Sequence, residues 1–151
     1  INVILNNINW KKYLKNPNTY IDKKVSLINK KNLLYKKKFL ICSLLLTNSR
    51  EIKKLNKKFR KKNKSTDVLS FPFHGKEELK NTINRNREIY LGDIVINLNE
   101  IKNKNNKIRF NENLDKLWVH GLVHLFGHEH KKNKDFYAMQ NIEKKYLRYI
   151  K

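Results

Sequence analysis

One short stretch predicts both a local fold and a chemical site: His120-Gly-Leu-Val-His-Leu-Phe-Gly-His-Glu-His130. His120 and His124 are four residues apart, so a helix would carry both on one face, one turn above the other. Gly127 stands where such a helix would end in a left-handed residue. The chain could then fold back and bring His130 to the same point. Three neutral imidazoles that leave one position open are typical of a catalytic zinc site rather than a structural one.

The same histidine spacing occurs in the metzincin proteases, which carry a glutamate directly after the first histidine. That glutamate is the general base of those enzymes, and here the position is Gly121. A metalloprotease is therefore disfavoured, although it stays an alternative because Glu129 is a nearby carboxylate. Among the other histidines, His128 is a weaker candidate for contact with metal or substrate, and His74 is expected to be solvated.

The length of the chain bounds its organisation. Its 151 residues suffice for one domain with a buried core, so we expect residues 1–151 to form a single domain. No segment approaches the length of a membrane span, and no membrane partner is expected. The one cysteine, Cys42, falls in the apolar run Phe39–Leu46, so we expect no disulfide partner and a reducing, cytoplasmic setting.

The charge of the chain is extreme, with 35 Lys and Arg against 13 Asp and Glu and a formal net charge of +22. Such a chain is attracted to polyanions, and nucleic acid is the first candidate. Compositional drift is an alternative source of the excess, because lysine, asparagine and isoleucine are all abundant. The lysines within residues 53–61 are expected to line one helix face, which would be either an ordinary solvated surface or one that follows phosphates.

The hydrophobic pattern predicts an alternation of strands and helices. Strands are expected at Val3–Leu5, Phe39–Leu46, Thr66–Pro72 and Leu91–Ile96. Helices are expected over residues 18–34, from 49 onward, and over 97–104, 112–126 and 135–149. The charged stretch 74–87 is expected to be a surface loop with some helix. This order predicts an α+β fold, a small mixed β-sheet covered by helices.

Four blocks of the sequence resemble the YbeY endoribonucleases, a family of bacterial factors for ribosomal RNA maturation. The blocks occur in the order of that family: Leu55–Arg60, Ser65–Pro72, Leu91–Ile94 and His120–His130. The pairing of the histidine block with Thr-Asp-Val-Leu-Ser-Phe-Pro makes the resemblance specific. It extends from about residue 39 to the C-terminal end, and the first third is similar only in pattern.

The resemblance implies a cytoplasmic, single-domain, zinc-dependent endoribonuclease with one Zn²⁺ per chain. Its zincin-like metal site would lie on a helix and the following turn, with His120, His124 and His130 as ligands. Arg60 matches the essential arginine of the family. The implied task is single-strand-specific cleavage that matures the 3′ end of 16S ribosomal RNA and serves ribosome quality control. The implied partners are ribosomal RNA and the small ribosomal subunit, and no oligomeric state is predicted.

Three carboxylates are candidates for a supporting role at the metal. Asp67 and Asp93 could orient a ligand histidine through its second ring nitrogen, or could equally brace local turns. Glu129 stands where the family commonly has aspartate, so its carboxylate is displaced by one methylene. Its role as an outer partner of the metal is therefore open.

The expected chemistry joins a zinc-bound water to the guanidinium of Arg60. Zinc would lower the pKa of its water toward ~7 for attack on phosphorus, and Arg60 would stabilise the phosphate charge with two parallel hydrogen bonds. Attack by the RNA 2′-hydroxyl is an alternative route. Nickel, copper and iron also suit three histidines. A non-catalytic RNA- or ribosome-binding factor with a structural zinc is the remaining alternative in function.

Overall fold

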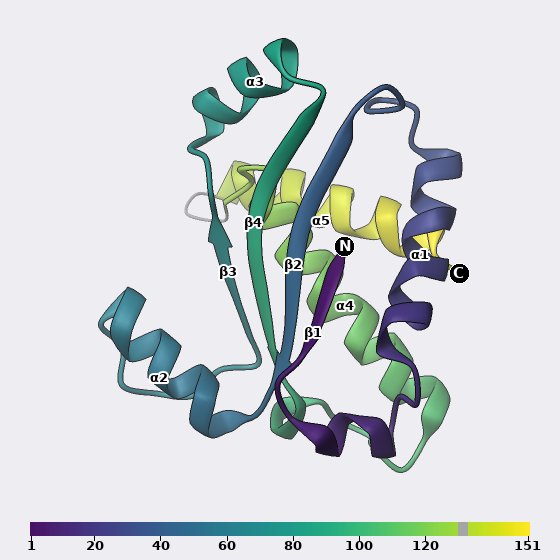
Figure 1. The fold of residues 1–151 in the computed structure, drawn as a ribbon, viewed down its shortest axis with the longest axis vertical. Coiled ribbons are helices and arrows are strands. Elements are labelled where there is room, and N and C mark those ends of the chain that lie inside the picture. The colour runs from purple at the N-terminus through teal and green to yellow at the C-terminus, as the bar shows by residue number, and fades with distance from the viewer. Residues whose placement is uncertain (130–132) are drawn as a thin grey trace.

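A computed structural model describes residues 1–129 and 133–151, with the backbone alone at 133 and 134. It confirms an α+β fold built on a mixed sheet (Figure 1). The sheet has the order β1-β2-β4-β3, with strands β1 (Asn2–Leu5), β2 (Phe39–Thr47), β3 (Val68–Pro72) and β4 (Glu88–Asn97). The first three strands in that order are parallel, and β3 runs antiparallel to β4 at the sheet edge.

Helices cover the two sheet faces unequally. One face carries α1 (Pro17–Lys31), α4 (Lys107–Leu125) and α5 (Asn133–Tyr149); Figure 1 shows α4 and α5 behind the strands and α1 beside them on the right. The other face carries α2 (Ser49–Arg60), which packs its Ile52 against Leu69 and Val95. The remaining helix, α3 (Lys76–Arg85), connects β3 to β4. None of the helices that the structure describes is long and apolar enough to cross a membrane.

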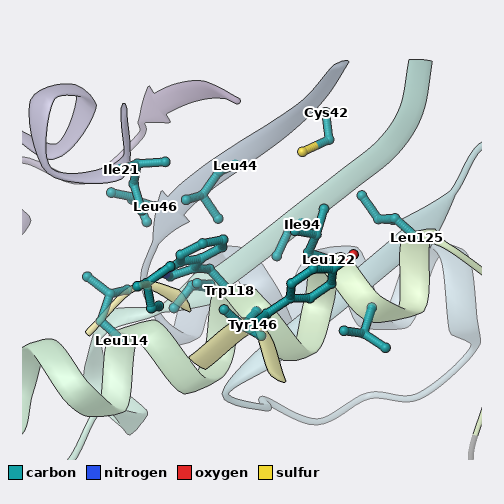
Figure 2. Close-up of a cluster of buried hydrophobic side chains, with 14 of the residues drawn as sticks. Ile21, Cys42, Leu44, Leu46, Ile94, Leu114, Trp118, Leu122, Leu125 and Tyr146 are labelled. Atoms are coloured by element: carbon teal, nitrogen blue, oxygen red, sulfur yellow. The ribbon is translucent and has the colours of Figure 1, made fainter. Parts of the chain in front are cut away.

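The main core lies between the sheet and α4. Alternate residues of β2 and β4, among them Leu44 and Ile94, point toward Trp118 of α4 and leave it fully buried (Figure 2). Tyr146 closes the same cluster from α5. Cys42 is free and buried in this layer, and burial raises the pKa of its thiol to about 11. The core therefore fixes α4, the helix that carries the paired histidines, against the middle of the sheet.

Two element predictions need correction. The expected helix over 97–104 is only a short 3-10 turn, Leu98–Glu100, because the side chain of Asn97 caps it and Asn103 takes a left-handed conformation. The stretch 74–87 is mainly helical, since α3 begins with two acidic residues that favour a helix start and buries Leu79. Charged and polar residues dominate this stretch, and its only two apolar helix residues, Leu79 and Ile83, gave a signal too short to separate a helix from a loop.

Candidate metal centre

Two histidines converge on the same face of α4. Nε2 of His120 and Nε2 of His124 lie 3.1 Å apart, and their rings are nearly perpendicular, with centroids 4.6 Å apart. Nitrogens that share one tetrahedral zinc at ~2.1 Å lie roughly 3.4 Å apart. The predicted pairing of these side chains by helical spacing is therefore present, at a separation that suits a shared metal ion.

The other ring nitrogen of each histidine contacts an acceptor. Nδ1 of His120 lies 2.6 Å from Oε1 of Glu143, and Nδ1 of His124 lies 2.8 Å from the backbone oxygen of His128. A carboxylate and a carbonyl can only accept, so each Nδ1 carries the proton and each Nε2 presents a lone pair. Outer hydrogen bonds of this kind orient histidine ligands in metal proteins. The donor set thus fits a divalent cation between the two Nε2 atoms.

The turn after α4 has the predicted left-handed glycine. Gly127 has φ +83°, and its N–H donates to the carbonyl of His124 over 2.9 Å. A side chain at this position would also crowd Lys76 of α3, whose atoms lie 3.2 Å from an added Cβ. The helix therefore ends where the sequence predicts. His130 lies outside the described residues, within which no group of three metal-binding side chains occurs, so the third ligand stays a prediction.

Gly121 allows α4 to approach the sheet directly beneath the histidines. A Cβ added there would lie 2.6 Å from Cγ2 of Ile94 and 3.2 Å from Oγ of Ser70. Ile94 is fully buried and β-branched, so it has little freedom to move aside. The partners of this close approach are the side chains of Ile94 in β4 and Ser70 in β3.

Arg60 ends α2 and reaches the edge strand of the sheet. Its Nη2 donates to the carbonyl oxygen of Ser70 over 2.8 Å, and its guanidinium lies 5.7 Å from the ring of Phe71. The side chain of Ser70 points to Gly121, between the two histidines in sequence. Ser70 therefore lies between Arg60 and α4: its backbone carbonyl contacts Arg60, and its side chain faces the helix that carries the histidines.

The two aspartates that were predicted to support the metal have their contacts elsewhere. Asp67 accepts from the backbone N–H of Val68 over 2.8 Å, which braces the start of β3. Asp93 accepts from the hydroxyl of Tyr90 over 2.6 Å. It neighbours Ile94, which faces α4, so the strand alternation directs Asp93 to the opposite face of the sheet. The structure does not bring either aspartate to the histidines, and Glu129 lies just past the Gly127 turn.

The carboxylate that the structure does bring to the histidines, Glu143 of α5, is absent from the sequence predictions. The sequence did contain a signal that Glu143 faces the core. It lies four residues after the buried Met139 and three before the buried Tyr146, so a helix carries all three on one side. A glutamate on the buried side of an amphipathic helix requires a partner. Here that partner is the Nδ1 of His120.

The surroundings of two other histidines, His74 and His128, differ from each other. His74 was expected to be solvated, but its side chain is only 12% exposed, with Nδ1 3.4 Å from Glu78 and its ring against Phe73. Burial, followed by the charge of Lys76, lowers the pKa of His128. The backbone oxygen of His128, rather than its ring, contacts His124.

Comparison with known proteins identifies the family of this chain. A family model for endoribonuclease YbeY matches residues 5–151. A Pelagibacter ubique protein named endoribonuclease YbeY is 41% identical over 145 residues, covering 94% of this chain and 90% of that protein. A Buchnera aphidicola protein of the same name is 36% identical over 121 residues, covering 78% and 72%. The fold is similar to the solution structure of a Thermotoga maritima protein, with a TM-score of 0.60 at 24% identity, covering 99% and 87%. With its histidine pair on a buried helix and a family match over almost its whole length, this chain belongs to the endoribonuclease YbeY family.

Proposed function

We propose that this protein is a metal-dependent, single-strand-specific endoribonuclease that matures the 3′ end of 16S ribosomal RNA and serves ribosome quality control. The observation that carries the proposal is the convergence of two imidazoles whose Nδ1 atoms are held by acceptors and whose Nε2 atoms are 3.1 Å apart. Residues 1–151 act as one domain, in the cytoplasm with the small ribosomal subunit. Family membership supports RNA as the substrate.

His120, His124 and His130 would hold one Zn²⁺ per chain. Zinc bound in this way lowers the pKa of a coordinated water and polarises a phosphoryl oxygen. Three neutral imidazoles that leave one position open suit this metal and this chemistry. Glu143 and the carbonyl of His128 keep the first two rings in the tautomer that presents Nε2.

Two sources of positive charge, the guanidinium of Arg60 and the net charge of the chain, would act on the phosphates of the RNA. The guanidinium of Arg60 is a fixed fork of N–H donors, and one hydrogen bond to the carbonyl of Ser70 anchors it. It can therefore bind a phosphoryl oxygen with its other N–H donors and stabilise charge that develops there. The net charge of +22 draws the RNA to the surface before any specific contact forms.

A peptidase activity has less support. The position of the metzincin general base is Gly121, and a Cβ there would point at Ile94 and Ser70 of the sheet. A carboxylate in the direction of that Cβ would enter the sheet packing instead of the space beside the Nε2 atoms. The helix thus has the metal-binding spacing without the base that peptide cleavage requires.

Replacing Glu143 by alanine is expected to weaken zinc affinity about 10- to 100-fold, because His120 loses the carboxylate that orients its ring. Glu143→Gln, which retains an acceptor oxygen, should show a smaller loss. Competition of the metal-free protein with a chromophoric chelator measures both affinities. The control is Glu112→Ala, which removes an exposed acid from α4 and should leave the affinity unchanged. Wild-type affinity in Glu143→Ala would remove this residue from the metal site.

Metal removal tests the proposed function itself. Purified protein treated with a chelator should stop cleaving precursor small-subunit ribosomal RNA, and one equivalent of Zn²⁺ should restore cleavage. Activity that survives complete metal removal would contradict a metal-dependent nuclease. RNA binding without cleavage in the zinc-loaded protein would instead favour a non-catalytic binding factor. Restoration by a different divalent ion alone would overturn only the choice of zinc.

A further inference from the structure

The sheet face that carries α2 is covered over only part of its area. Figure 1 shows α2 beside one end of the strands, and toward the other end the described helices leave this face open. Large apolar side chains stand there in solvent: Phe73 is 67% exposed and Phe39 is 60% exposed, and Phe59 at the end of α2 is 58% exposed. Three exposed phenylalanines on one side of a small domain mark an interaction surface.

The three exposed rings and two half-buried ones lie along this face of the sheet, and we name them together the aromatic row: Phe59, Phe71, Phe73, Tyr90 and Phe39. Phe71 lies in β3, and Phe73 follows directly after the strand ends, where its N–H still donates to the carbonyl of Leu91 in β4 over 2.9 Å. The ring of Phe59 lies 5.4 Å from that of Phe71, and the ring of Phe73 lies 5.6 Å from that of Tyr90. Tyr90 pairs with Ile41 of β2, two residues from Phe39. The row therefore runs from the end of α2 across β3 and β4 to β2.

Each end of the aromatic row carries cations beside its rings. Lys58 lies 5.3 Å from the ring of Phe59, and Arg60 lies 5.7 Å from that of Phe71. At the far end Arg87 lies 5.5 Å from the ring of Phe39. Two acids also lie on this face. Asp93 accepts a hydrogen bond from the hydroxyl of Tyr90, and Glu88 of β4 is the register partner of Phe39 in β2. The row thus places a cation within 5.7 Å of the ring of Phe59, of Phe71 and of Phe39.

We propose that the aromatic row is a stacking surface for the bases of single-stranded RNA. Bases stack on exposed aromatic rings whatever their sequence, and neighbouring cations follow the phosphates. An apolar protein partner would have to bury the three cations without compensation, whereas RNA supplies an anion for each. Arg60 lies beside the ring of Phe71 in the row and donates to the backbone carbonyl of Ser70, whose side chain faces α4 on the other side of the sheet. On the proposed function, the row would therefore hold the RNA strand beside Arg60, while the histidine pair lies on the opposite face of the sheet.

Binding to a short unstructured RNA, measured with metal-free protein, tests the proposal without cleavage. Stacking on one ring predicts that Phe73→Ala weakens binding roughly tenfold, and that Phe39→Ala with Phe73→Ala weakens it further. Phe73→Trp retains an aromatic face and should keep near wild-type affinity, whereas Phe73→Leu should resemble alanine. An RNA containing 2-aminopurine should be quenched by the wild type and not by the double variant. Ile108→Ala, which removes an exposed apolar side chain from α4, is the control.

Each outcome bears on the aromatic row alone. Unchanged affinity in the double variant would overturn the proposal, and so would rescue by leucine, which supports apolar packing against a protein instead of stacking. Cleavage of ribosomal RNA by the wild type is measured separately with zinc. A wild type that cleaves, with variants that bind RNA normally, would sustain the proposed function and refute the row. If the wild type never cleaves RNA but the variants lose RNA binding, the aromatic row would be supported and the proposed nuclease function refuted.

Discussion

Replacing His124 by alanine is expected to lower kcat/KM for RNA cleavage by at least about 10³-fold, because the metal loses one of its ligands. The Nε2 of His124 is 3.1 Å from that of His120, so its removal leaves half of the described donor pair. The side chain is only partly buried and alanine favours helices, so α4 should persist. Cleavage assays, metal content and circular dichroism of the same preparations measure the three consequences.

The matched control for that substitution is His74→Ala, which removes an imidazole that contacts Glu78 and Phe73 instead of the donor pair. It should retain both bound metal and cleavage, once its folding is verified. Wild-type cleavage by His124→Ala would point to a contaminating nuclease and contradict the proposed role. Full metal content in His124→Ala with cleavage lost would assign His124 to the substrate and leave the metal to other ligands.

The local geometry of the histidine pair could be predicted because it depends on near neighbours in the sequence. Four-residue spacing on a helix and a glycine at the helix end are both local rules, and His120, His124 and Gly127 follow them. The strand β2 was equally local, because its run of apolar residues predicted a strand, although consecutive leucines in that run did not distinguish its buried side from its more exposed one. These features need no knowledge of how distant segments pack.

The partners of the site could not be predicted in the same way, because they depend on tertiary packing. Glu143 contacts His120 across 23 residues, through the packing of α5 on α4. Asp93 follows Gly92 in β4, and a register shift between β2 and β4 pairs Ile41 with Tyr90 and the next residue, Cys42, with Gly92. An extra residue at such a bulge changes which later residues face the core. The face on which Asp93 lies is therefore decided by the strand pairing.

Arg60→Ala is expected to lower the rate of the cleavage step about 10²- to 10³-fold while leaving the fold intact. A fixed donor aimed at charge in the transition state contributes roughly 2–4 kcal/mol. Arg60 is exposed at the end of α2, and it is oriented by the carbonyl of Ser70 and the ring of Phe71. Arg60→Lys should recover only part of the rate, because an ammonium lacks the planar fork of N–H donors. Single-turnover kinetics at saturating enzyme separate this rate from RNA affinity.

Lys57→Ala is the matched control, since it removes one exposed positive charge from the same helix without the contacts of Arg60. If Arg60 acts on the reacting phosphate, its loss lowers the single-turnover rate, whereas loss of Lys57 changes only the long-range attraction of RNA. Raising the salt concentration should therefore reduce the small effect of Lys57→Ala on affinity and leave the rate defect of Arg60→Ala in place. Equal defects in both variants would reduce Arg60 to one cation among many on a chain of net charge +22.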